Sequence, residues 1–253
     1  MSTIKQSAAD WCFYKNISDP DAYYRKLKEI GFGAVEMAAP QRWESIRSAG
    51  LEILNIAGPG MREGLNNPDN HSQLIPEITT LIDQAAENRI PHVIILSGNN
   101  GDISVDQGFS TCVQAVRELA KKAEDSGVVL TFEMLNRYNH EDYQADHSGY
   151  GFRLVEEIDS SAVKILYDIY HMHRMGEDVL TDVLEHLDRI VHIHVAGSPD
   201  RNFPGPDQEI DYPTLVKEIT AAGYSGYWGH EWMGSDAFPN QMAEAQRLFA
   251  GYC

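Results

Sequence analysis

The stretch EDSGVVLTFE, residues 124–133, joins a helical pattern to a buried strand pattern and decides the fold. The residues before it, 107–125, carry apolar side chains at helical spacing. Gly127 supplies the left-handed turn that a helix-to-strand connection needs. The apolar run then ends on a carboxylate, Glu133. The same order of helix, glycine and strand recurs in EIGFGAVEM (29–37), RSAGLEIL (47–54) and TAAGYSGYWGHE (220–231).

Eight segments of the chain carry strand patterns, and helical patterns lie between them. The expected strands are Gln6–Phe13, Ala34–Ala38, Glu52–Ala57, His92–Ser97, Val129–Leu135, Val163–Ile169, Val191–Ala196 and Gly226–Trp232. The expected helices are Pro20–Ile30, His71–Asn88, Gln107–Asp125, Met175–Leu187 and Tyr212–Ala222. Because the first strand has no GxGxxG after it, a dinucleotide-binding sheet is disfavoured. Eight βα units in 253 residues predict an α/β fold, a single (β/α)8 TIM barrel over residues 1–253.

The net charge and the cysteines limit which partners and which cellular compartment are expected. A net charge of -18, from 20 basic and 38 acidic side chains, disfavours nucleic acid and anionic membranes as partners. The excess acid is most simply a solvated surface. Three widely spaced cysteines, Cys12, Cys112 and Cys253, without a CxxC, indicate free thiols in a reducing compartment. The N-terminus has no apolar signal core, so we expect a soluble cytoplasmic protein.

Four strand ends carry side chains that bind metals. The candidates are Glu133, then Asp168 with His171, then His192 with His194, and finally His230 with Glu231. The carboxyl ends of the strands of a parallel barrel converge on one mouth. Three carboxylates and an imidazole in one pocket repel one another unless a cation lies among them, and this set of atoms suits Mg or Mn. The sequence therefore predicts metal-assisted chemistry on a small, oxygen-rich substrate.

Each candidate also has a simpler interpretation. Glu133 could pair with a basic residue of a helix, Asp168 could cap the next helix, and His171 could be a hydrogen-bonded structural histidine. Their shared place at strand ends favours metal binding by Asp168 and substrate contact by His171. Since side chains alternate along a strand, His192 and His194 share a face. His194, nearer the mouth, is the better ligand candidate, and His192 is the better candidate for support or packing.

Four other residues near these strand ends are also considered for a role in the site. Glu231 adjoins Trp232, which predicts a raised pKa that suits proton transfer. Arg201, seven residues after His194, is a solvated loop cation or a clamp for a substrate oxygen or carboxylate. Glu36 supports the site or forms an ion pair in the core. Cys12 has only Lys15 as a local cation, which disfavours a nucleophilic role.

At these residues the chain resembles the xylose-isomerase-like TIM barrels, and within them most closely the hydroxypyruvate isomerase family. The resemblance lies in GFGAVEM, FEMLNR, LYDIYHMHRMGED, HIHVAGSPDRNFPG, QEIDY and GYWGHEW. It implies that Glu133, Asp168, His194 and Glu231 bind a divalent metal ion, Mg or Mn. It further implies that Glu133 and Glu231 are the two acid/base groups, that His171 and Arg201 bind the substrate, and that the protein forms a homo-oligomer.

The resemblance implies an isomerase that interconverts hydroxypyruvate and tartronate semialdehyde through an enediolate. The alternative is a ketose 3-epimerase, of the tagatose or psicose type, acting on a neutral ketose. Hydroxypyruvate isomerases usually have glutamine at His194, and the HIH pattern is closer to the epimerases. Those epimerases usually have a further glutamate at the position of Asn139. A metal-dependent DNA endonuclease on this scaffold is disfavoured by the charge, and a non-catalytic binding protein by the intact pair of glutamates.

Overall fold

The computed structural model describes residues 4–234 and 237–252. Two compact units make up this part of the chain. The first unit contains the residues up to Leu54, Asp178–Leu187 and those from His192 on. The second unit contains Asn55–Glu177 and Asp188–Val191.

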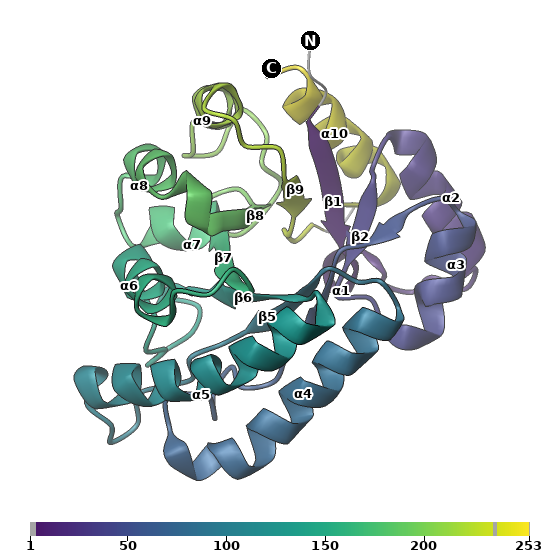
Figure 1. The fold of residues 1–253 in the computed structure, drawn as a ribbon. Helices are drawn as coiled ribbons and strands as arrows, with labels where there is room; N and C mark the ends of the chain where they lie inside the picture. Colours follow the sequence, from purple (N-terminus) through teal and green to yellow (C-terminus); the bar gives the residue numbers. More distant parts are fainter. Residues whose placement is uncertain (1–3, 235–236, 253) are drawn as a thin grey trace. The chain divides into compact units, whose positions relative to one another are not determined.

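Parallel strands build the first unit, in the order β3-β2-β1-β9-β8 (Figure 1). They are β1 (Lys5–Ala9), β2 (Ala34–Glu36), β3 (Glu52–Ile53), β8 (Ile190–Val195, from His192 on in this unit) and β9 (Tyr227–His230). The helices are α1 (Asp10–Phe13), α2 (Pro20–Ile30), α3 (Trp43–Ser48), α8 (Val179–Glu185), α9 (Tyr212–Ala221) and α10 (Met242–Ala250), with a 3-10 turn at Pro40–Arg42 and a π-type turn at Ala237–Gln241.

Parallel strands also build the second unit, in the order β7-β6-β5-β4. They are β4 (Asn55–Ala57), β5 (His92–Ile95), β6 (Val129–Glu133) and β7 (Val163–Asp168). The helices are α4 (His71–Glu87), α5 (Val105–Ser126), α6 (Ser148–Ile158) and α7 (Ile169–Arg174), with a 3-10 turn at Pro68–Asn70. The long helices α4 and α5 pack against each other, as Figure 1 shows. A further 3-10 turn, Leu187–Arg189, precedes β8.

The connection predicted from residues 124–133 is confirmed. Helix α5 buries its apolar face and ends at Ser126, and Gly127 follows with φ 66°. Strand β6 then runs to Glu133, which pairs in register with Leu166 of β7. The predicted helix Pro20–Ile30 is also confirmed as α2, and the Asp19 side chain caps it by accepting a hydrogen bond from the main-chain N–H of Ala22 at 2.9 Å. These local signals set where the strands end, and therefore which side chains stand at the ends.

Most of the predicted strands end one or more residues early, and the first and the third differ most from the prediction. The first ends at Ala9 rather than Phe13, because Asp10 starts α1 and its buried carboxylate pairs with Arg42 at 2.6 Å. The segment Glu52–Ala57 is two strands, of which β3 pairs with β2 and β4 pairs with β5. The chain therefore has more strand segments than the eight predicted.

The helix predictions were incomplete. The helix expected at Met175–Leu187 begins only at Val179, capped by Asp178. Helices α3, α6, α7 and α10 were not predicted. The segment that forms α6 contains Gly149 and Gly151, which weaken helix propensity, and Gly151 is needed because a Cβ there would meet Met134. No helix within residues 4–234 and 237–252 combines the length and the hydropathy that crossing a bilayer requires.

Candidate active site

Two carboxylates stand side by side where neighbouring strands of the second unit end. Glu133 is the last residue of β6, and Asp168 is the last residue of β7. Both side chains are buried, and a carboxylate oxygen of one lies within 4.8 Å of an oxygen of the other. Two buried anions this close repel each other unless a cation or proton lies between them. Their chemistry therefore fits a divalent metal ion, and the alternative of Glu133 as an outward-facing surface residue is wrong.

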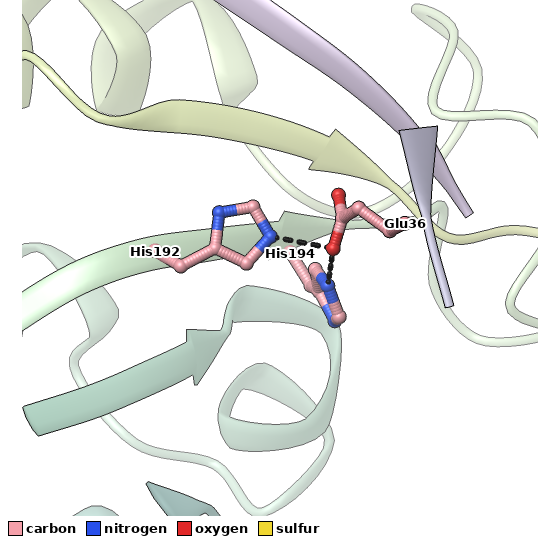
Figure 2. A group of neighbouring side chains, drawn as sticks. All are labelled: Glu36, His192 and His194. Atoms are coloured by element: carbon pink, nitrogen blue, oxygen red, sulfur yellow. Dashed lines mark hydrogen bonds and ion pairs between the residues drawn. The ribbon is translucent and has the colours of Figure 1, made fainter. Parts of the chain in front are cut away.

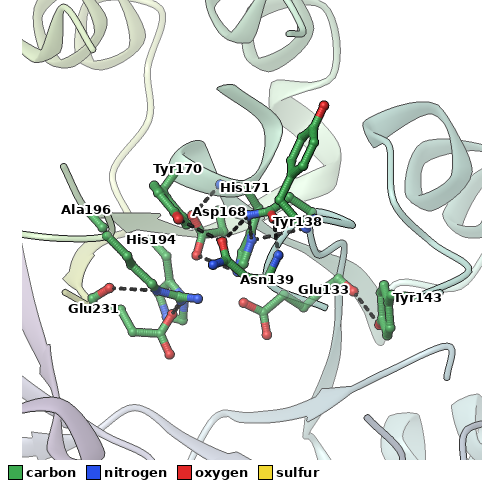
Figure 3. A network of polar contacts seen from close by, with 12 residues as sticks. Glu133, Tyr138, Asn139, Tyr143, Asp168, Tyr170, His171, His194, Ala196 and Glu231 are labelled. Carbon is green, nitrogen blue, oxygen red and sulfur yellow. Dashed lines mark hydrogen bonds and ion pairs between the residues drawn. The ribbon is translucent and has the colours of Figure 1, made fainter. Parts of the chain in front are cut away.

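The histidine after β7 is held in one orientation (Figure 3). Asp168 caps α7 by accepting a hydrogen bond from the main-chain N–H of His171 at 3.1 Å. The His171 Nδ1 atom accepts from the main-chain N–H of Asn136 at 3.1 Å, with the Asn136 side-chain nitrogen 2.7 Å away. Because Nδ1 is an acceptor there, the neutral ring carries its proton on Nε2. The Nε2 atom, which then carries the hydrogen, lies 3.6 Å from Asp168 Oδ2.

An asparagine pair connects His171 to a hollow in the same unit. The Asn136 side chain donates to Asn139 Oδ1 at 3.0 Å, and the Tyr170 hydroxyl donates to the same oxygen at 2.7 Å. Asn139 lines a hollow of about 730 Å3, together with Arg62 and Asn99. With its oxygen already accepting two hydrogen bonds, Asn139 offers its amide N–H groups to this hollow.

Three loops form the walls of the hollow and are tied by main-chain hydrogen bonds. The N–H of Asn99 donates to the carbonyl of Arg62 at 2.8 Å, and the N–H of Asn100 donates to the carbonyl of Asp142 at 2.8 Å. The N–H of Gln144 donates to the carbonyl of Gly98 at 2.9 Å. The loops after β4, β5 and β6 therefore form one preorganised surface.

In the first unit, one carboxylate oxygen of Glu36 contacts two histidine rings (Figure 2). The Oε2 atom of Glu36, at the end of β2, lies 2.8 Å from His192 Nε2 and 2.9 Å from His194 Nε2. All three side chains are fully or almost fully buried. Burial alone would raise the pKa of Glu36, but the two imidazoles bring it well below its ordinary value. The prediction that His192 and His194 share a face is confirmed, and Glu36 is the residue that they share.

Glu231 follows β9 and is surrounded by donors. Trp11 Nε1 donates to Glu231 Oε1 at 2.8 Å, and Arg201 Nη2 donates to Oε2 at 2.5 Å. His194 Nδ1 lies 2.9 Å from the same Oε2 atom. Burial raises the pKa of Glu231, but His194 and Arg201 outweigh it and lower the pKa to about 2. The predicted raised pKa is therefore wrong, because Glu231 contacts the N–H of Trp11 and a guanidinium rather than an apolar ring.

The structure places the other candidates as follows. His230 bonds Gln6 through Nε2 at 2.9 Å and lies in the core of the first unit. Cys12 is buried, and burial raises the pKa of its thiol, which agrees with an inert residue. Cys253 lies outside the described residues. The positions missed from the sequence are Trp11 and Asn136, whose partners are 220 and 35 residues away and leave no local pattern.

The predicted metal ligands thus occur as two pairs, one in each unit. Glu133 and Asp168 form the pair in the second unit, and His194 and Glu231 form the pair in the first. The first pair offers carboxylate oxygens, and the second offers a carboxylate oxygen and an imidazole nitrogen, all of which are atoms that bind divalent ions.

Comparison with known proteins gives the family. A model of the xylose isomerase-like TIM barrel family matches residues 24–251. Hydroxypyruvate isomerase of Escherichia coli K12 is 29% identical over 56% of this chain and 53% of its own length. A 2-oxo-tetronate isomerase of Pectobacterium atrosepticum is 26% identical over 83% of this chain and 84% of its own length. D-psicose 3-epimerase of Enterocloster bolteae is 27% identical over 74% of this chain and 68% of its own length.

Solved structures agree on the fold. An AP endonuclease of family 2 from Brucella melitensis aligns with a TM-score of 0.84 at 21% identity, over 98% of this chain and 99% of the other. D-psicose 3-epimerase from Clostridium cellulolyticum H10, solved with D-tagatose, aligns with a TM-score of 0.80 at 18% identity, over 98% of both chains. These matches confirm the TIM barrel, while the division of the chain into one domain stays a prediction. The chain belongs to the xylose isomerase-like TIM barrel family.

Proposed function

We propose that the protein is a metal-dependent isomerase of a small hydroxy-carbonyl compound, and that this compound is hydroxypyruvate. Its named relatives are isomerases and epimerases, which supports an enzyme of the sugar isomerase and epimerase type. The reaction would move a proton between adjacent carbons and give tartronate semialdehyde through an enediolate.

The observation that carries this proposal is the buried pair of carboxylates, Glu133 and Asp168, within 4.8 Å of each other. We propose that this pair and the pair His194 and Glu231 bind one divalent ion, Mg or Mn. The carboxyl ends of the strands of a TIM barrel face one mouth, and all four residues come at or next to the end of a strand. When bound, the ion would supply electrophilic stabilisation of negative charge on the substrate oxygens.

The two glutamates would move the proton. One would remove it from the carbon that bears the hydroxyl, and the other would deliver a proton to the neighbouring carbon, while the hydroxyl proton passes to the former carbonyl oxygen. Glu231 would be the group that accepts the proton, because His194 and Arg201 outweigh its burial and keep it ionised, although a pKa this low makes it a weak base. Glu133 is fixed through its main-chain carbonyl, which accepts a hydrogen bond from the Tyr143 hydroxyl at 3.0 Å. Groups positioned in this way typically contribute about 10²–10⁴-fold each.

His171 and Arg201 would hold the substrate. Asn136 fixes His171 through Nδ1, so Nε2–H is the donor of this ring, and Arg201 brings a guanidinium beside Glu231. Hydroxypyruvate carries a carboxylate, so it needs a local cation in a chain of net charge -18. Two of the three relatives named above act on 2-oxo acids by their names, which supports this choice.

The hollow beside Asn139 favours a second candidate, a ketose 3-epimerase. At about 730 Å3 it is much larger than a three-carbon acid requires, and its asparagines suit the hydroxyls of a longer sugar. D-psicose 3-epimerase also matches 74% of this chain, a larger share than the match to hydroxypyruvate isomerase.

The deciding experiment is a substrate panel with added Mn, followed by proton NMR. It contains hydroxypyruvate, erythrulose, tagatose and fructose, each run in deuterium oxide with and without metal. Metal-dependent conversion of hydroxypyruvate, with uptake of deuterium, is the expected result. Faster turnover of a neutral ketose would replace the first candidate by the second. No exchange with any of these compounds would remove both.

A further inference from the structure

Glu36 lies at the centre of a buried cluster in the first unit, and it touches one of the proposed metal ligands. Its Oε2 atom contacts Nε2 of both His192 and His194, while Ser7 Oγ donates to its Oε1 atom at 2.6 Å. We propose that Glu36 is a positioning residue, which orients the His194 ring so that Nδ1, and not Nε2, is the atom that binds the metal. This inference rests on the metal site proposed above.

The direction of the hydrogen bonds supports this role. Nε2 of each ring faces the same oxygen of Glu36, which is placed to accept a hydrogen bond from both rings. On His194 this leaves Nδ1 on the other edge of the ring, and Nδ1 lies 2.9 Å from Glu231 Oε2. The ring therefore spans two glutamates, with Glu36 on one edge and Glu231, a proposed ligand, on the other. A histidine held by a carboxylate in this way is a more basic and better oriented ligand.

The surroundings of Glu36 are built to hold a charged carboxylate. Strand β9 passes the cluster at Gly229, where a Cβ would lie 2.8 Å from His192 Nε2 and from His194 Cδ2, and closer still to Glu36 Oε1. Only a glycine leaves room for the carboxylate and both rings. A fully buried anion without such donors would be strongly unfavourable. The three donors from β1 and β8 therefore make an ionised Glu36 tolerable in the core.

His192 serves the glutamate rather than the metal. Its Nδ1 atom is buried and has no hydrogen-bond partner among the described residues, so its one polar contact is the bond from Nε2 to Glu36. The ligand atoms of Glu36, His192 and His194 lie close enough to hold an ion themselves. Both Nε2 atoms already donate to Glu36, however, so they have no lone pair for a metal.

The first test measures Mn binding by calorimetry, without substrate, in the wild type and in three folded variants. Glu36→Gln removes the charge, and Glu36→Leu removes both acceptor atoms. Ser7→Ala is the matched control, because it removes a donor to Glu36 but touches neither imidazole. We expect about 10–100-fold weaker binding for the two Glu36 variants, with the larger loss for leucine, and a smaller loss for Ser7→Ala, which leaves both imidazole contacts in place. One ion per chain is expected, and two would mean that the cluster itself binds metal.

The second test needs no variant. Long-range ¹⁵N–¹H correlation spectra of the Mg-loaded wild type report which nitrogen of each histidine carries hydrogen. Protonated Nε2 atoms on both His192 and His194 are expected, and an unprotonated Nε2 on His194 overturns the inference. Equal metal affinity in folded Glu36→Gln, Glu36→Leu and wild type also overturns it. A wild type that binds no metal at all refutes the proposed function instead, so the two failures are distinguishable.

Discussion

Arg201 holds Glu231 at two points. Its Nη2 atom contacts Glu231 Oε2 at 2.5 Å, and its Nε donates to the Glu231 main-chain carbonyl at 3.2 Å. Arg201 itself has a left-handed backbone, with φ 53°, which turns the loop so that the guanidinium faces the end of β9. The arginine expected to clamp a substrate therefore also fixes the glutamate expected to move a proton.

Replacing Arg201 by methionine should remove both the expected substrate clamp and the support of Glu231. We expect a loss of about 2–5 kcal/mol in transition-state binding, because Glu231 would lose a charged donor in a buried place. Arg201→Lys should recover part of this loss, since it restores the charge but not the fork of N–H groups. The measurement is kcat/KM for hydroxypyruvate and for a neutral ketose. If Arg201 also binds the substrate carboxylate, the loss is greater for the acid, and equal turnover of the acid by Arg201→Met would exclude that role.

Removing either catalytic carboxylate should stop turnover. Glu133→Gln and Glu231→Gln should each lower kcat by at least about 10²-fold at saturating Mn, while circular dichroism shows an intact fold. Weaker metal binding is expected as well, because both side chains are proposed ligands. Glu118→Gln, on the exposed face of α5, is the control and should keep full activity. Near-normal activity of Glu231→Gln at saturating metal would take Glu231 out of the mechanism.

A methyl group at Gly229 should damage the cluster around Glu36. Gly229→Ala places a Cβ 2.8 Å from both His192 Nε2 and His194 Cδ2, so the free energy of unfolding should fall by about 1–3 kcal/mol. Gly251→Ala is the matched control, with an ordinary φ of -86° and no atom nearer than 3.4 Å. Urea denaturation of both variants tests this, and equal stabilities would show that the cluster is less tightly packed than described.

The buried thiols should be unreactive in the native protein. Burial raises the pKa of Cys112 to about 12 and also raises that of Cys12. At pH 8 a thiol with that pKa is ionised to only about one part in 10⁴, and the thiolate is the form that reacts. In a Cys253→Ser variant, a disulfide reagent such as DTNB should therefore label the native chain far more slowly than the urea-unfolded chain. Rapid labelling of either cysteine in the folded state would contradict its burial.

Sequence periodicity located most of the strands and the residues at their ends. Gly127 and the apolar run after it put Glu133 at the end of β6, and the alternation in HIH put His192 and His194 on one face. Local rules succeed here because they depend on neighbouring residues. The shared partner of the two histidines could not be found in this way, because Glu36 lies 156 residues before His192.

The electrostatics of Glu231 were missed for the same reason. The adjacent Trp232 suggested an apolar setting, but the atoms that touch the carboxylate come from Trp11 and Arg201, 220 and 30 residues away in the chain. Similarly, nothing local to Asp10 shows that it pairs with Arg42 and ends the first strand. A pKa or a strand end that depends on residues far away in the sequence can be predicted only when the fold is known.

The hydrogen bonds that tie the loops after β4, β5 and β6 have a consequence for engineering the hollow beside Asn139. Each loop completes the main-chain bonding of another, so a graft that exchanges one loop alone leaves amide and carbonyl groups of its neighbours unpaired. The shape of the hollow is therefore transferable between relatives only as a block of three segments. A chimaera that moves residues 58–66, 97–101 and 138–144 together is therefore the exchange that would keep the shape of the hollow.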